Sequence, residues 1–139
     1  MLLRVVDMEK CIGCYECMMA CSRRRGYISI SKSAITVRTH GGLERGFVVI
    51  ACHGCVDEDV PACARACPTG ALTRRPGGGV KLDEEVCTGC GECVKACIIG
   101  AITWDSDREK PIICEHCGYC ANYCPHGILK LVEPGRELI

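Results

Sequence analysis

The distribution of apolar and polar residues predicts many short strands joined by turns. Stretches that are apolar, partly β-branched and of strand length lie at residues 2–6, 33–39, 47–51, 68–73, 80–82, 98–104 and 125–132. Glycines within residues 40–46 indicate a hairpin loop, in which His40 is an ordinary loop residue. Residues 17–23 fit a short helix. We therefore expect an α+β fold built from antiparallel hairpins and short helices.

A short repeat and a shortage of large side chains refine this picture. The segments Gly70-Ala71-Leu72 and Gly100-Ala101-Ile102 each follow a cysteine group and lead into a predicted strand. The chain has one Phe, one Trp and four Tyr, so a conventional apolar core would be thin. The missing stability must come from cross-links or metal, because ligation free energy becomes folding free energy when the site exists only in the folded chain.

The 16 cysteines among 139 residues fall into four groups. Motif one is Cys11, Cys14, Cys17 and Cys21; motif two is Cys52, Cys55, Cys63 and Cys67; motif three is Cys87, Cys90, Cys93 and Cys97; motif four is Cys114, Cys117, Cys120 and Cys124. Motifs one, three and four share the spacing C-x2-C-x2-C-x3-C, and motif two is interrupted by an acidic loop at 56–62. Three thiolates on a tight turn can hold one cubane iron–sulfur cluster, and in paired-cluster ferredoxins the fourth binds the neighbouring cluster.

Disulfides and zinc sites account for the cysteines less well. Structural disulfides normally require an oxidising compartment, and residues 1–7 carry neither a secretory apolar stretch nor a twin-arginine motif. A partner that carries the export signal for both chains is the alternative to the cytoplasmic location that we expect. Zinc sites usually combine two C-x2-C pairs separated by a dozen or more residues. Four closely spaced thiolates suit a cubane with four irons better than one ion.

The remaining residues favour electron transfer over catalysis. With 17 basic and 17 acidic side chains the chain has no net charge, which argues against a nucleic-acid surface. No nucleophile triad, phosphate loop or dinucleotide motif accompanies the cysteines. His53 and His116 are not needed as ligands because the cysteine sets are already complete, so we expect loop or outer-shell roles for them. A cubane with four thiolates exchanges single electrons and has no open coordination position.

From Cys11 to residue 132, the four motifs resemble the four-cluster ferredoxin subunits of molybdenum and tungsten pterin oxidoreductases, of the dimethyl-sulfoxide-reductase and tungsten aldehyde-oxidoreductase types. The resemblance implies one domain, residues 1–139, in which two bacterial-ferredoxin-like units are nested around four 4Fe–4S cubane clusters. The outer unit would comprise residues 1–50 and 105–139, and the inserted unit residues 51–104.

The resemblance also implies that motif one pairs with motif four, and motif two with motif three. The four implied ligand sets are Cys11, Cys14, Cys17 and Cys124; Cys114, Cys117, Cys120 and Cys21; Cys52, Cys55, Cys63 and Cys97; and Cys87, Cys90, Cys93 and Cys67. The predicted strands at 2–6 and 129–132 flank the outer motifs, and pairing them would bring the chain ends together. Spacing alone leaves open the tandem alternative, in which motif one pairs with two and three with four.

The expected function is therefore a relay of single electrons to or from a catalytic oxidoreductase subunit. A tungsten or molybdenum pterin enzyme such as an aldehyde oxidoreductase is the favoured partner, and a further redox carrier is possible. The alternatives are a free-standing polyferredoxin, or a subunit of a formate dehydrogenase, hydrogenase or carbon monoxide dehydrogenase. We expect no nucleic-acid partner and no membrane insertion. The segment at 133–139 is a candidate docking segment, and plain disorder is the equal alternative.

Overall fold

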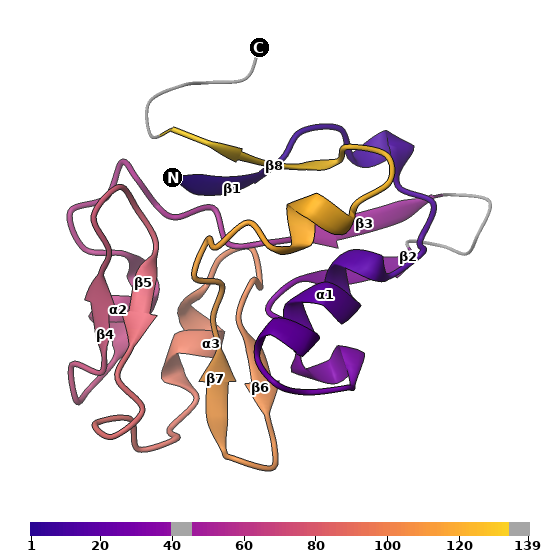
Figure 1. Ribbon diagram of the computed structural model, residues 1–139. Coiled ribbons are helices and arrows are strands. Elements are labelled where there is room, and N and C mark those ends of the chain that lie inside the picture. The colour runs from indigo at the N-terminus through magenta and orange to yellow at the C-terminus, as the bar shows by residue number, and fades with distance from the viewer. Residues whose placement is uncertain (40–45, 134–139) are drawn as a thin grey trace.

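The computed structural model of the chain describes residues 1–39 and 46–133. Within these ranges, eight strands form four two-stranded antiparallel sheets (Figure 1). The pairs are β1 (Leu2–Val5) with β8 (Leu129–Val132), β2 (Thr36–Thr39) with β3 (Phe47–Ile50), β4 (Leu72–Arg74) with β5 (Val80–Leu82), and β6 (Thr103–Asp105) with β7 (Lys110–Ile112). The expected α+β class with short antiparallel strand pairs is confirmed. The loop at 40–45, with His40, and the tail at 134–139 lie outside the described residues.

The first and last strands close the chain on itself. Leu2 lies opposite Val132 and Val5 opposite Leu129 in the antiparallel register. Figure 1 shows the indigo β1 beside the yellow β8 at one end of the molecule. The pairing expected between these two strands is therefore confirmed.

The strands that flank the two middle motifs pair differently. β3, which precedes motif two, pairs with β2, and β6, which follows motif three, pairs with β7. Strand β7 was not predicted from the sequence. Its central residue Pro111 has no N–H to donate and is therefore uncommon inside strands. Here it faces Trp104 in an isolated two-stranded ribbon, where one missing donor is tolerated.

The helices are short and carry cysteines. They are α1 (Glu16–Arg24), α2 (Ala62–Ala66) and α3 (Glu92–Ala96), with 3₁₀ turns η1 (Met8–Lys10), η2 (Ile30–Lys32) and η4 (Cys120–Tyr123). The helix predicted at 17–23 corresponds to α1. A five-residue helix has little intrinsic stability, so α2 and α3 depend on their mutual contact and on their surroundings. No helix within the described ranges is long and apolar enough to cross a membrane.

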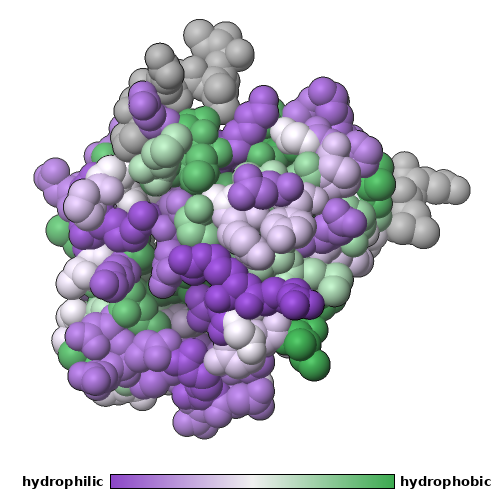
Figure 2. All heavy atoms as spheres, in the orientation of Figure 1, coloured by the Kyte–Doolittle hydropathy of each residue, from purple (hydrophilic) through white to green (hydrophobic). Residues whose placement is uncertain are grey.

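Two apolar clusters form the core. The larger combines β1, α1, the β2–β3 ribbon and β8 around Leu3, Ile35 and Leu129. The smaller joins the β4–β5 ribbon to α3 through Leu72, Val80 and neighbouring residues. Cysteine side chains belong to both clusters. On the face drawn in Figure 2, polar and apolar residues are intermixed.

An ion pair at the edge of the larger cluster joins distant segments. Asp105, at the end of β6, is 2% exposed and accepts hydrogen bonds from Lys32 of η2 and from the amides of Asp107 and Arg108 at 3.1 and 3.3 Å. The Lys32 ammonium lowers the pKa of the Asp105 carboxyl below its usual range. The contact fastens the segment after α1 onto the β6–β7 ribbon.

Substitution of two isoleucines tests the position of the core. Ile35 is 1% exposed in the larger cluster, whereas Ile28 in the same connecting segment is 95% exposed. We expect Ile35→Ala to lower the free energy of unfolding by about 2–5 kcal/mol, because it leaves a cavity. The same change at Ile28 removes the same atoms from the surface and should have little effect. Urea unfolding followed by circular dichroism measures both, and equal losses would contradict the described core.

Candidate metal centres

Each motif begins with a tight turn that presents its first thiols. In motif one the turn needs Gly13, whose φ is +73°. A Cβ on Gly13 would lie 2.2 Å from two ring carbons of Phe47, so the aromatic ring occupies the place of a side chain. The turn therefore depends on glycine for both conformation and space. A short helix or 3₁₀ turn then follows and carries the third cysteine.

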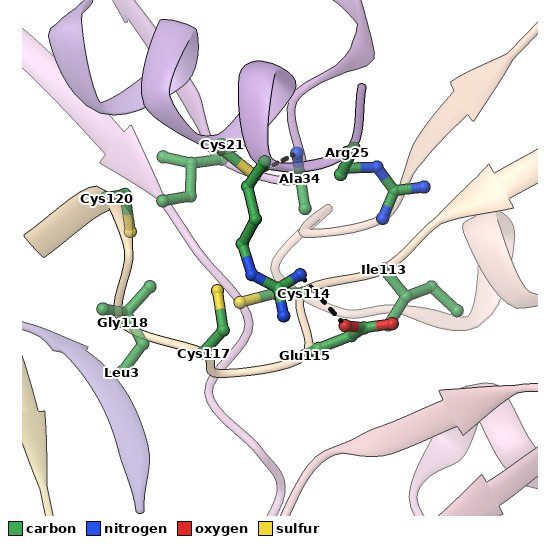
Figure 3. Close-up of a pocket in the computed structure, with 12 residues that line it drawn as sticks. Leu3, Cys21, Arg25, Ala34, Ile113, Cys114, Glu115, Cys117, Gly118 and Cys120 are labelled. Atoms are coloured by element: carbon green, nitrogen blue, oxygen red, sulfur yellow. Dashed lines mark hydrogen bonds and ion pairs between the residues drawn. The ribbon is translucent and has the colours of Figure 1, made fainter. Parts of the chain in front are cut away.

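The structure gathers cysteines from motifs one and four around two cavities. Cys21 lines one cavity together with Cys114, Cys117 and Cys120. Figure 3 shows Cys21 reaching this space from α1, while the other three come from the segment after β7 and from η4. The second cavity is lined by Cys11, Cys14, Cys17 and Cys124. We call these groups the Cys114 set and the Cys11 set.

Motifs two and three are gathered in the same crossed manner. Cys67 lines a cavity with Cys87, Cys90 and Cys93, which we call the Cys87 set. Cys97 lies close enough to Cys52, Cys55 and Cys63 to raise the pKa of each thiol, after the larger effect of burial. We call these four residues the Cys52 set. All 16 cysteines are free thiols, and each of the four sets draws its members from two motifs.

Backbone amides point at the sulfurs that cross between motifs. Cys67, Cys97 and Cys124 each accept an N–H from the residue four positions later, at 3.3–3.4 Å. Motif one lacks the turn that follows those cysteines, and Cys21 instead accepts the N–H of Ala34 at 3.3 Å. Such hydrogen bonds stabilise a thiolate, which is the form that binds iron. The donor set therefore fits iron–sulfur ligation.

Comparisons with known proteins agree with this chemistry. Residues 50–101 and 86–129 match models of the 4Fe-4S dicluster domain, and residues 5–26 match a 4Fe-4S binding domain. The chain is 32% identical over 151 residues to the probable anaerobic dimethyl sulfoxide reductase chain YnfG of Escherichia coli, covering 94% of this chain and 71% of the relative. The chain belongs to the ferredoxin-type 4Fe-4S electron-transfer subunits. The predicted resemblance, the presence of multiple 4Fe–4S clusters and the non-catalytic role of the subunit are thereby confirmed.

Two further relatives differ in how much of their own length this chain covers. A tetrathionate reductase subunit of Archaeoglobus fulgidus is 34% identical over 121 residues, which cover 81% of this ferredoxin-type subunit and 54% of the relative. The putative electron transport protein YsaA of E. coli is 30% identical over 142 residues, covering 93% of this chain and 88% of the relative. The chain thus spans about half of the tetrathionate reductase subunit and most of YsaA.

Without iron, most of the thiols whose pKa is shifted in this ferredoxin-type subunit are held in the neutral form. Burial, followed by the neighbouring thiols of its own set, raises the pKa of Cys17 to about 11. Burial also raises the pKa of Cys63 to about 11 and that of Cys114 to about 12. Iron reverses this preference, because a coordinating cation favours the thiolate. The thiolate forms of these ligands would therefore be favoured only when metal is bound.

Cys67 is the exception, and a residue that the sequence did not single out explains it. Burial disfavours the Cys67 thiolate, but hydrogen bonds from the Thr69 hydroxyl and from the Thr69, Ala71 and Leu72 amides outweigh burial and lower its pKa. The Thr69 Oγ1 atom lies 3.7 Å from Cys67 Sγ and lines the cavity of the Cys87 set. The only signal in the sequence was a hydroxyl residue just after Cys67-Pro68.

The two histidines differ in their surroundings. His53 is exposed, and its carbonyl oxygen accepts a hydrogen bond from Arg4. His116 is 3% exposed, and its amide donates to Cys114 Sγ at 3.4 Å. Burial, Arg75 and Arg4 lower the pKa of the His116 imidazole to about 4, so the ring is neutral at pH 7. His116 was expected to lie outside the ligand sets. Its backbone amide nevertheless contacts a cysteine of the Cys114 set directly.

Removing the Thr69 hydroxyl should shift the potential of one cluster. A hydrogen bond to a ligand sulfur stabilises the extra negative charge of the reduced state. We expect Thr69→Val to lower the midpoint potential of one cluster by tens of millivolts. Thr73→Val, on the exposed side of β4, is the matched control. A redox titration followed by electron paramagnetic resonance measures the shift, and identical potentials in both variants would refute this role for Thr69.

Proposed function

We propose that the chain relays single electrons through four 4Fe–4S clusters to or from a catalytic oxidoreductase subunit. The proposal rests on the four sets of cysteines described above, each with four sulfurs and backbone or side-chain donors nearby. The Cys11, Cys114, Cys52 and Cys87 sets are the proposed ligand sets, with Cys124, Cys21, Cys97 and Cys67 as the crossing members. Each bound cluster supplies one-electron redox chemistry, and the chain supplies spacing, burial and hydrogen bonds.

We further propose the nested organisation, with residues 51–104 inserted between 1–50 and 105–139. Three observations support it. The pairing of β1 with β8 links the two outer segments, the contact of α2 with α3 links motifs two and three, and the two apolar clusters divide the chain in nearly the same way. In addition, residues 50–101 match a two-cluster domain model.

The proximity of individual cysteines supports an order for the four sites. Cys17 of the Cys11 set contributes, after burial and nearer thiols, to the raised pKa of Cys120 in the Cys114 set. Cys52 likewise contributes to the raised pKa of Cys114, after burial. The proposed row is therefore the Cys11, Cys114, Cys52 and Cys87 sets, and the first and last sets are its ends. Electrons enter or leave at those ends.

We propose a molybdenum or tungsten pterin oxidoreductase as the partner, with an aldehyde oxidoreductase as the specific candidate. Similarity to subunits named for dimethyl sulfoxide reductase and tetrathionate reductase supports a reductase or dehydrogenase complex. The second candidate is a free-standing carrier. It is favoured by the match to 88% of a relative named only as an electron transport protein. A formate dehydrogenase, hydrogenase or carbon monoxide dehydrogenase is the alternative partner.

Iron analysis of double variants tests the ligand sets. The anaerobically purified protein should contain about 16 irons and 16 acid-labile sulfides, because each cubane holds four of each. Cys97→Ala combined with Cys55→Ala should leave about 12 irons, since both changes strike one proposed site. Cys97→Ala combined with Cys90→Ala strikes two sites and should leave about 8 irons.

The reverse pattern would contradict the crossed assignment. If Cys97 served the site of its own motif, the pair with Cys90 would retain more iron than the pair with Cys55. Cys67→Ala gives a second, independent comparison. Combined with Cys90→Ala it should remove the iron of one site, and combined with Cys55→Ala the iron of two sites. A wild-type value near four irons would overturn the four-cluster proposal itself.

Purification of the untagged native protein tests the partner. We expect it to elute with a larger catalytic subunit that contains molybdenum or tungsten, detected by metal analysis of the same fractions. Elution of the chain alone, with full iron content, would favour the free-standing carrier. A companion subunit that contains nickel would replace the pterin proposal with a hydrogenase or carbon monoxide dehydrogenase.

A further inference from the structure

His116 occupies a position that the other three motifs fill with glycine. Gly13, Gly54 and Gly89 have φ values of +73°, +81° and +74°, and His116 adopts the same kind of backbone conformation with φ +56°. A histidine in this region is uncommon because its Cβ crowds the backbone. The turn of motif four therefore accepts conformational strain in order to place an imidazole where its counterparts have no side chain.

The imidazole of His116 contacts the N-terminal strand and the β4–β5 ribbon. Its Nδ1 accepts the N–H of Leu3 in β1 at 3.0 Å. Because Nδ1 is the acceptor, the ring proton lies on Nε2. A Cβ on Gly79, at the turn side of β5, would lie 2.8 Å from Cδ2 and 2.9 Å from Nε2. The ring thus fills the space that the side chain of residue 79 would otherwise occupy.

Gly79 connects the His116 ring to motif two through hydrogen bonds. Its N–H donates to the Gly54 carbonyl oxygen at 2.7 Å. The N–H of Gly54 in turn donates to Cys52 Sγ at 3.4 Å. On the other side of the ring, the N–H of His116 donates to Cys114 Sγ, also at 3.4 Å. Hydrogen bonds and one packing contact therefore connect a sulfur of the Cys114 set to a sulfur of the Cys52 set.

This connection crosses the boundary between the two halves of the proposed row. Cys114 and Cys52 are neighbours, since the Cys52 thiol contributes to the raised pKa of Cys114. The Cys11 and Cys114 sets share α1, and the Cys52 and Cys87 sets share α2 and α3. In the part of the chain that the structure describes, the two middle sets share no helix, so other contacts must fix the distance between them.

We propose that His116 is a positioning residue that fixes the Cys114 site relative to the Cys52 site, and so controls electron transfer between the two halves of the chain. The inference rests on the proposed function. The imidazole acts as a spacer between motif four and the β4–β5 ribbon, while its Nδ1 holds it against β1. Its Nε2 makes no hydrogen bond to the described residues.

Two substitutions at position 116 test the spacer in the full-length, cluster-loaded chain. His116→Gly introduces the residue of the other three turns and removes the ring. His116→Asn keeps a side-chain acceptor and tolerates positive φ. Spin–spin interaction between reduced clusters, measured by electron paramagnetic resonance, reports their spacing. We expect it to weaken several-fold in His116→Gly, and to a smaller extent in His116→Asn, with iron and sulfide content unchanged.

A change on the opposite side of the contact keeps the histidine and supplies a matched control. Gly79→Ala inserts a methyl group against the ring, at a φ of +81°. Gly70→Ala introduces the same backbone strain, at φ +69°, where nothing lies within 4 Å of the new Cβ. We expect Gly79→Ala to change the cluster interaction and Gly70→Ala to leave it unchanged.

The outcomes separate this inference from the proposed function. Unaltered cluster interaction in both His116→Gly and Gly79→Ala, at full iron content, would overturn the positioning role while leaving the relay intact. If His116→Gly loses iron, Gly79→Ala against Gly70→Ala decides the question, because the histidine and all ligands remain. Far fewer than 16 irons in the unaltered protein would instead overturn the relay on which the inference depends.

Discussion

The structure depends on the cost of holding thiolate charge inside a small protein. Burial raises the pKa of Cys17, Cys63 and Cys114 well above the ordinary value, so these side chains are unfavourable as anions until a metal is bound. Amides directed at Cys21, Cys67, Cys97 and Cys124 offset part of that cost. The short helices and ribbons arrange these donors, and the thin apolar core leaves metal ligation as a principal source of cohesion.

The exchange of the fourth cysteine explains how such short elements can define one structure. Helices of five residues would not persist alone, yet α2 and α3 are each followed directly by a cysteine that lies with three thiols of the other motif. Every proposed site therefore also links two segments of chain. The Asp105–Lys32 ion pair and the β1–β8 ribbon add links that do not involve sulfur.

Cysteine spacing was sufficient to find the four motifs, and short apolar runs predicted most of the strands, whereas the crossed ligand sets came from the family resemblance. The strand at 80–82 follows from local pattern, because its apolar residues stand beside a turn. The pairing of the terminal strands was instead expected from the resemblance to nested ferredoxin units. Strand β7 was missed because Pro111 is a poor strand residue and tertiary context overrides that preference. The donors Ala34 and Thr69, and the contact of His116 with Leu3 and Gly79, were also missed. The contacts of Ala34 and His116 arise only on folding and leave no periodic pattern in the sequence, whereas Thr69 is a local donor two residues after Cys67.

The pairing of β1 with β8 has a consequence for biosynthesis. On the proposed ligand sets, the Cys52 and Cys87 sets are complete once Cys97 has been made, whereas the Cys114 and Cys11 sets still need Cys120 and Cys124. A ribosome therefore releases the last ligand of the inner pair before the outer pair can be completed. The order of synthesis favours cluster loading from the inside outward, and β8 closes against β1 only after the ligands of the inner pair have been made.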